Sequence, residues 1–135
     1  MSLFGALPIA NSGIDLAQTW INATAGNIAN ANDAVSTSEG AYQTQYVEAQ
    51  PVASSQANGA GQGVTSTVVL GDNQGQEELD PPNPLADANG MVRYPDVNMG
   101  QQMVNLVMAQ TDYQANVSVI NQAKTAYQSA LQLGN

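Results

Sequence analysis

The chain has 135 residues, of which 11 are acidic and two, Arg93 and Lys124, are basic, so its formal net charge is -9. Two cations cannot displace the counterions of a nucleic acid or hold anionic lipid head groups, which excludes both as expected partners. The absence of Cys and His removes thiol chemistry, imidazole catalysis, disulfides and the usual zinc sites.

The N-terminal ten residues carry a short apolar patch without a basic residue before it. No part of the chain approaches the ~18 apolar residues of a membrane span. We therefore expect neither a cleavable secretory signal nor a membrane helix.

The first predicted element is a helix over residues 9–31, since Pro8 is expected to disturb a helix that begins earlier. Small and apolar residues recur on it at helical spacing in two adjacent stripes. The stripes are Ile14, Ala17, Ile21, Thr24, Ile28 and Gly13, Leu16, Trp20, Ala23, Asn27. An ordinary buried helix of a small bundle would show this face. Because the chain offers no third helix, the face is better suited to a partner helix and neighbouring subunits together.

Residues 34–97 have no helical period, and we expect a small β-rich insert that is poorly ordered in the free monomer. Alternating patterns predict strands at 41–47, 64–70, 76–79 and 91–94, with Tyr42, Thr44 and Tyr46 on one face of the first. Residues 51–63 predict a loop or hairpin tip, and the prolines of 80–84 predict an extended segment. Asn89-Gly90 predicts a turn.

The last element is a helix of roughly 50 Å that begins after Asn98 and continues to Leu133, before Gly134. Asn98 is a suitable N-cap, and Gln101 three residues later suggests a capping box. A heptad seam runs along this helix through Met103, Leu106, Gln110, Tyr113, Val117, Ile120, Lys124, Tyr127 and Leu131.

The predicted fold is mainly α. Segments 1–33 and 98–135 form one discontinuous domain in which two long helices pair as a coiled coil, and the β-rich insert 34–97 joins them. If the helices are antiparallel, Asp15 near the start of one could meet Lys124 near the end of the other. We put forward this ion pair as a hypothesis, because it would neutralise the charge of Lys124 within the heptad seam.

No catalytic, cofactor or metal site is predicted, and we do not expect an enzyme. Glu77, Glu78 and Asp80 lack the ligand pattern of a calcium loop and are interpreted as a solvated surface turn. The glycine-rich stretch 59–63 is followed by neither a lysine nor a helix, which excludes a phosphate loop.

Three motifs carry a resemblance to a known family. Residues 27–32 (Asn-Ile-Ala-Asn-Ala-Asn) resemble the signature near the end of the N-terminal helix in bacterial flagellar axial proteins of the rod and hook. Residues 103–106 (Met-Val-Asn-Leu) with 113–116 (Tyr-Gln-Ala-Asn) are similar to their C-terminal signature. Residues 83–92 (Asn-Pro-Leu-Ala-Asp-Ala-Asn-Gly-Met-Val) resemble the segment before the last helix of a proximal-rod member.

The resemblance extends over essentially the whole chain, with departures. Sister rod proteins usually carry Thr-Pro-Gly after the first motif, whereas residues 33–35 are Asp-Ala-Val here. Gln102 stands where the family usually has an acidic residue. Thr111, with Asp112 next to it, stands where an arginine is usual. These differences put in doubt any interfacial ion pair carried over from relatives.

The resemblance implies a structural subunit of the proximal rod, the drive shaft of the flagellar basal body. Such a subunit is exported unfolded from the cytosol through the flagellar type III export apparatus, without a cleavable signal, and is located in the periplasmic rod of the basal body, within the cell envelope. It polymerises through its terminal helices with copies of itself and other rod proteins, and it transmits torque. Isolated helices are marginal in water, so ordering on assembly also follows from the sequence.

The predicted interface combines apolar stripes with amides and tyrosines, whose hydrogen bonds would set subunit register. Alternatively, the polar members merely cap and solvate the helices. The predicted interface residues are Ile14, Trp20, Ile21, Asn27, Ile28, Asn30, Asn32, Met103, Leu106, Tyr113, Gln114, Asn116, Val117, Ile120, Tyr127 and Leu131.

The alternative function is a secreted helical-hairpin binding module or an export adaptor, which would also be acidic, free of cysteine and built on two helices. Such a module has no evident need for the segment 83–92. It would also be helical when dilute, whereas a rod subunit would gain helix on assembly.

Overall fold

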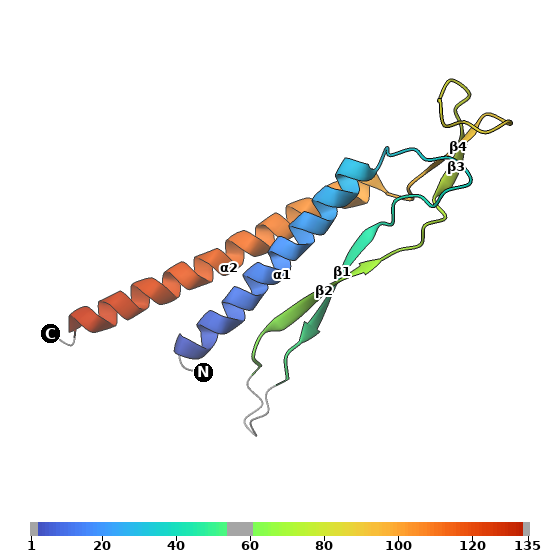
Figure 1. Cartoon of the computed structure of the whole chain (residues 1–135). Coiled ribbons are helices and arrows are strands. Elements are labelled where there is room, and N and C mark those ends of the chain that lie inside the picture. The colour runs from blue at the N-terminus through green and yellow to red at the C-terminus, as the bar shows by residue number, and fades with distance from the viewer. Residues whose placement is uncertain (1–2, 54–60, 134–135) are drawn as a thin grey trace.

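The computed structural model describes residues 3–53 and 61–133 and shows a long helical pair with a β-rich insert at its side (Figure 1). This mainly α architecture with a small β insert agrees with the sequence prediction. In chain order the elements are α1 (Leu3–Asn30), β1 (Gln45–Pro51), β2 (Val64–Leu70), β3 (Gln76–Leu79), β4 (Met91–Tyr94) and α2 (Met99–Leu133).

The two helices run antiparallel and pack against each other along most of α1 (Figure 1). Gly13 lies against Asn116, so closely that a methyl group at Gly13 would be 2.7 Å from Oδ1 of Asn116. Asn27 lies fourteen residues after Gly13 on α1. It donates a hydrogen bond to Gln102, which lies fourteen residues before Asn116 on α2. These two contacts fix the register of the pair.

The helix pair buries small and polar side chains. The buried residues on the two helices are Ala10, Ala17, Ala23, Thr24 and Asn27 on α1, and Gln102, Ala109 and Ala123 on α2. Small side chains let the helix backbones approach closely, and the large side chains are displaced to the rims of the contact.

The seven-residue spacing predicted for α2 is found in the structure, but the buried positions are shifted by one residue. Gln102, Ala109 and Ala123 are buried at multiples of seven residues, one position before the predicted Met103, Gln110 and Lys124. Among the predicted apolar members, Met103, Tyr113, Tyr127 and Leu131 are each more than a third exposed. The predicted seam followed the large apolar residues, whereas the contact between the two helices is made by residues small enough for close approach.

Two local predictions at the helix starts need correction. Helix α1 continues through Pro8 and does not begin after it. The φ of proline suits a helix, and in the second turn its missing N–H costs one backbone bond. Asn98 does cap α2, because its Oδ1 accepts the Gln101 N–H at 3.0 Å. Gln101 does not complete a capping box, since its amide donates to Asn105 Oδ1.

The insert contains two antiparallel hairpins, β1–β2 beside α1 and β3–β4 beyond the end of the helix pair (Figure 1). Strands β2, β3 and β4 have the predicted bounds. Beyond β1 and β2, the Val52 N–H donates to the Gly63 carbonyl at 2.9 Å and the Gln62 N–H donates to the Val52 carbonyl at 3.3 Å. Residues 54–60 of the predicted tip lie outside the described residues. In the second hairpin Val92 is fully buried.

The first strand begins four residues later than predicted. Residues 41–44 precede β1, and Tyr42 and Tyr46 do not share a face: Tyr42 donates to Asn27, whereas Tyr46 is 54% exposed. The segment predicted as extended at 80–84 contains a turn, in which the Asn83 N–H donates to the Asp80 carbonyl at 3.0 Å. A proline φ fits such a turn as well as an extended chain.

The structure does not bring Asp15 and Lys124 together. With the register fixed at Gly13 and Asn27, Asp15 lies opposite about residue 114 of α2, which is about 15 Å along the axis from Lys124. Within residues 3–53 and 61–133 the recorded ion pair is Arg93–Glu77, at 2.8 Å.

Close approach of the helices makes a specific prediction for Ala109, which is fully buried. Ala109→Leu should lower the free energy of unfolding by about 1–3 kcal/mol, because the added carbons overpack the contact. Thermal unfolding followed by circular dichroism at fixed protein concentration measures the change. Ala115→Leu, at an exposed position on the same helix, is the matched control. Equal melting temperatures for the two variants would contradict the small-residue contact.

Candidate assembly interface

Charge is nearly absent from the two helices. Their charged side chains are Asp15, Asp112 and Lys124, and the other charged residues of the chain lie between Asp33 and Asp96. Helix surfaces that face water normally carry many charged residues opposite their apolar stripe. The outer surface of α2 therefore has the composition of a surface that is covered by protein.

The first third of α2 exposes a compact set of large apolar side chains on the side away from α1. Met103, Val104, Val107 and Met108 are 56%, 53%, 62% and 51% exposed. Contiguous exposed apolar surface of this kind marks protein–protein contact sites. We call these four residues the α2 cluster.

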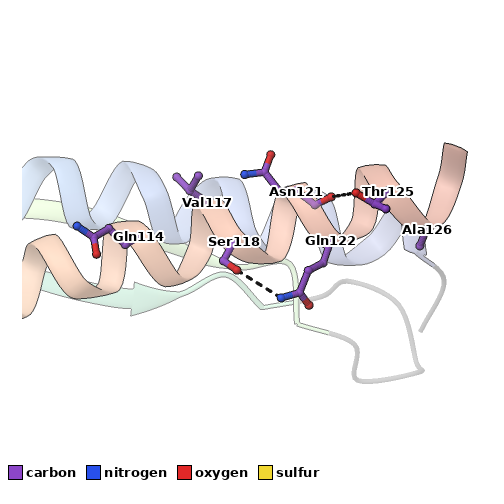
Figure 2. A pocket seen from close by; sticks show the side chains of 7 residues that line it. All are labelled: Gln114, Val117, Ser118, Asn121, Gln122, Thr125 and Ala126. Atoms are coloured by element: carbon purple, nitrogen blue, oxygen red, sulfur yellow. Dashed lines mark hydrogen bonds between the residues drawn. The ribbon is translucent and has the colours of Figure 1, made fainter.

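Further along the helix, side chains on one face of α2 line a shallow, open groove (Figure 2). Gln122 donates to the Ser118 hydroxyl, and Thr125 donates to the Asn121 carbonyl. These amides and hydroxyls offer donors and acceptors without charge, which suits the face of another helix. The groove is lined by Gln114, Val117, Ser118, Asn121, Gln122, Thr125 and Ala126.

One buried amide joins α1, β1 and α2. Asn27 is 1% exposed, and its Oδ1 accepts the backbone N–H of Gln45 at 2.8 Å and the Tyr42 hydroxyl at 3.2 Å. Its Nδ2 donates to the Gln45 carbonyl at 2.8 Å and to Gln102 Oε1 at 3.1 Å. The Asn27 amide thus pairs with the backbone edge of β1 as a neighbouring strand would.

The predicted interface asparagines have different positions. Asn27 is buried within the subunit, and Asn116 lies against Gly13 on α1. Asn30 donates to the Gly26 carbonyl at 2.7 Å and so satisfies the end of α1. Asn32 is exposed beyond that end.

The remaining predicted interface residues lie on the surface or at the rims of the helix pair. Met103, Tyr113, Gln114, Tyr127 and Leu131 are exposed on α2. The partly exposed ones are Ile14, Trp20, Ile21, Ile28, Leu106, Val117 and Ile120.

The prediction missed three members of the α2 cluster, Val104, Val107 and Met108, because it followed a single heptad seam. The signal available in the sequence was the absence of charge from residues 99–111. It also missed Gln45 and Tyr42 as partners of Asn27, and no local pattern indicates those contacts.

The acidic residues of the insert are not simply a solvated turn. Glu77 lies in β3 and pairs with Arg93, and Asp80 accepts hydrogen bonds from Asn83 and Tyr94. Burial, together with the neighbouring Asp80 carboxylate, raises the pKa of the Tyr94 hydroxyl.

Residues 83–90 of the segment 83–92 form the turn before β4, and its last two residues begin that strand. Asp87 Oδ1 accepts the N–H groups of Asn89 and Met91, and the Met91 bond is the main reason that the pKa of Asp87 is lowered. Gly90 adopts φ 79°, which an L-residue rarely does, so the predicted Asn89-Gly90 turn is confirmed.

Two further properties of the described residues concern membranes and metal ions. None of their helices is both long and apolar enough to cross a bilayer. They also contain no cluster of three or more acidic, His or Cys side chains arranged to hold a metal ion.

The sequence is similar to several known proteins. The family described as Flagellar basal body rod FlgEFG protein C-terminal matches residues 88–133, which include all of α2. The chain is 36% identical to the flagellar basal-body rod protein FlgC of Salmonella typhimurium over 99% of both chains. It is 35% identical to FlgC of Escherichia coli O6:H1 over 99% of both. The chain belongs to the FlgC family.

A further FlgC relative is less similar to the chain. FlgC of Borreliella burgdorferi is 29% identical over 97% of both chains. Membership of the FlgC family confirms the resemblance based on the three motifs, and it makes the chain a structural protein of the flagellar basal-body rod. Gln102, which departs from the expected family pattern, is the α2 partner of Asn27.

The Asn27 network predicts a large effect from a nearly isosteric change. Asn27→Asp removes the donor to Gln45 and Gln102 and places a carboxylate against two oxygen acceptors. We expect a loss on the order of 3 kcal/mol in the free energy of unfolding at pH 7. Urea unfolding measures it, and Asn22→Asp, exposed on the same helix, is the control. Similar stabilities for the two variants would contradict the role of Asn27.

Proposed function

We propose that this chain is a subunit of the proximal rod that polymerises through its paired terminal helices. The segments 1–33 and 98–135 act as one axial unit, packed as a coiled coil in the rod, which transmits torque from subunit to subunit. Its partners are copies of itself and other rod proteins, with neither nucleic acid nor lipid among them, and no catalytic step is assigned to it.

The observation that carries this proposal is the outer surface of α2. It is nearly free of charge, exposes the α2 cluster and continues into the uncharged groove of Figure 2. In a chain of net charge -9, the carboxylates of separate copies repel, whereas this surface permits close contact. Burying it between subunits supplies the apolar stabilisation that the small-residue helix contact gives only in part.

The same features support export before folding. A helix pair that buries mainly alanine and polar side chains has little apolar burial to hold it together in isolation. We propose that the chain passes unfolded through the flagellar type III export apparatus without a cleavable signal peptide. Its helices fold with low stability in the free subunit and are stabilised further when neighbouring subunits cover α2.

A charge in the α2 cluster tests this proposal. Val107→Asp should leave the free energy of unfolding of the free chain within about 0.5 kcal/mol, because Val107 is 62% exposed. In cells that lack the native chain, the variant should be lost from isolated basal bodies and should not restore motility. Mass spectrometry of the basal bodies and swimming assays measure these outcomes.

The matched control is Ala88→Glu, an exposed position in the insert turn, which should assemble and restore motility. Recovery of Val107→Asp in basal bodies at the native level would contradict an interface at the α2 cluster. Absence of the native chain itself from basal bodies that contain the other rod proteins would contradict the rod function.

A further inference from the structure

A second exposed apolar set lies on the β1–β2 hairpin. Val68 and Leu70 at the end of β2 are 42% and 55% exposed and lie on one face of the strand, whereas Val69 between them, 39% exposed, lies on the other face. We call Val68 and Leu70 the β2 cluster. Residues 64–71, like residues 99–111 around the α2 cluster, contain no charged side chain.

The two clusters lie at the same level along the long axis of the subunit. Asn27 bonds to Gln102 on α2 and to both backbone groups of Gln45, and Gln45 is paired with Leu70. From this common level, α2 runs toward the start of α1. Strand β2 runs in the same direction when it is followed backwards from Leu70 to Val64. Each cluster covers about 10 Å or less in that direction.

The clusters also lie at opposite edges of the subunit. At the level of Gln45, its backbone N–H and C=O point to Asn27, so α1 lies at one edge of β1 and Leu70 of β2 lies at the other. The start of β2, by contrast, contacts α1, where the Val64 N–H donates to the Ser12 hydroxyl. A crevice lined by β1 and by Gln102 and Asn105 of α2 confirms that β1 is the strand nearer to α2. Figure 1 shows α1 between α2 and the hairpin, and neither strand of that hairpin packs on α2.

A second copy of this chain is the occupant that fits both clusters. Copies of net charge -9 repel each other wherever their inserts meet, but neither cluster carries a carboxylate. Two apolar surfaces at one level and at opposite edges are suited to a head-to-tail lateral contact, in which different patches of identical subunits meet. Such contacts generate rings or helical arrays.

We propose that the α2 cluster of one copy packs on the β2 cluster of the next copy in the rod, with little axial offset. This contact rests on the proposed rod function and specifies its lateral interface. It gives the hairpin a defined role, because β2 covers the apolar part of the neighbour's α2.

The absence of cysteine allows a direct test by disulfide cross-linking. Leu70→Cys and Val107→Cys are introduced on separate copies and co-expressed in cells that lack the native chain. Isolated basal bodies are oxidised and run on a non-reducing gel. We expect a dimer of this chain when both variants are present and none when either is expressed alone, because the contact joins different patches.

The matched control pairs Leu70→Cys with Ala126→Cys, which lies about 28 Å further along α2 and should give no dimer. Basal bodies that retain both variants but form no Leu70–Val107 dimer would overturn the proposed contact and leave the rod function intact. An equally strong dimer from the control pair would also overturn it. If Val107→Cys is not retained, Leu70→Cys with Val104→Cys provides the same test.

Discussion

The arrangement of this subunit depends on one buried side chain, Asn27. Its amide satisfies both backbone groups of Gln45 and also bonds to Tyr42 and Gln102. A hydrophobic side chain at this position would leave buried polar groups without partners, and a carboxylate would supply acceptors where donors are needed. Because the bonds are directional, Asn27 sets the register of α2 against α1 and the position of the hairpin together.

The contact between α1 and α2 around Asn27 determines which side chains of the subunit are buried and which are exposed. Alanine and glycine allow the helix axes to approach closely, and the large apolar residues of α2 remain outside. An isolated subunit that buries its small residues and exposes Met103, Val107 and Met108 is incomplete. The charge distribution agrees, since acidic residues are concentrated in the insert and the helices are nearly uncharged.

Features governed by local chemistry could be predicted from the sequence: the Asn98 cap, the Asn89-Gly90 turn and the bounds of β2, β3 and β4. The predicted start of β1 was wrong because Asn27, far away in the chain, determines where residues 42–45 lie. The predicted α2 seam was shifted because apolar periodicity cannot distinguish a seam of large residues from one selected for close approach. Val104, Val107 and Met108 were missed for the same reason, although the lack of charge around them was visible.

The most direct test of this account is whether the α2 cluster is covered in the rod. Met103 and Met108 are both more than half exposed in the subunit, and thioether oxidation reports solvent access. Brief peroxide treatment followed by mass spectrometry compares the free chain with isolated basal bodies, with Met91 of the insert as the internal reference. If neighbouring subunits cover the α2 cluster, both methionines should oxidise readily in the free chain and should be protected several-fold in basal bodies, relative to Met91. Equal oxidation of Met103 and Met108 in the two samples would contradict an interface at the α2 cluster.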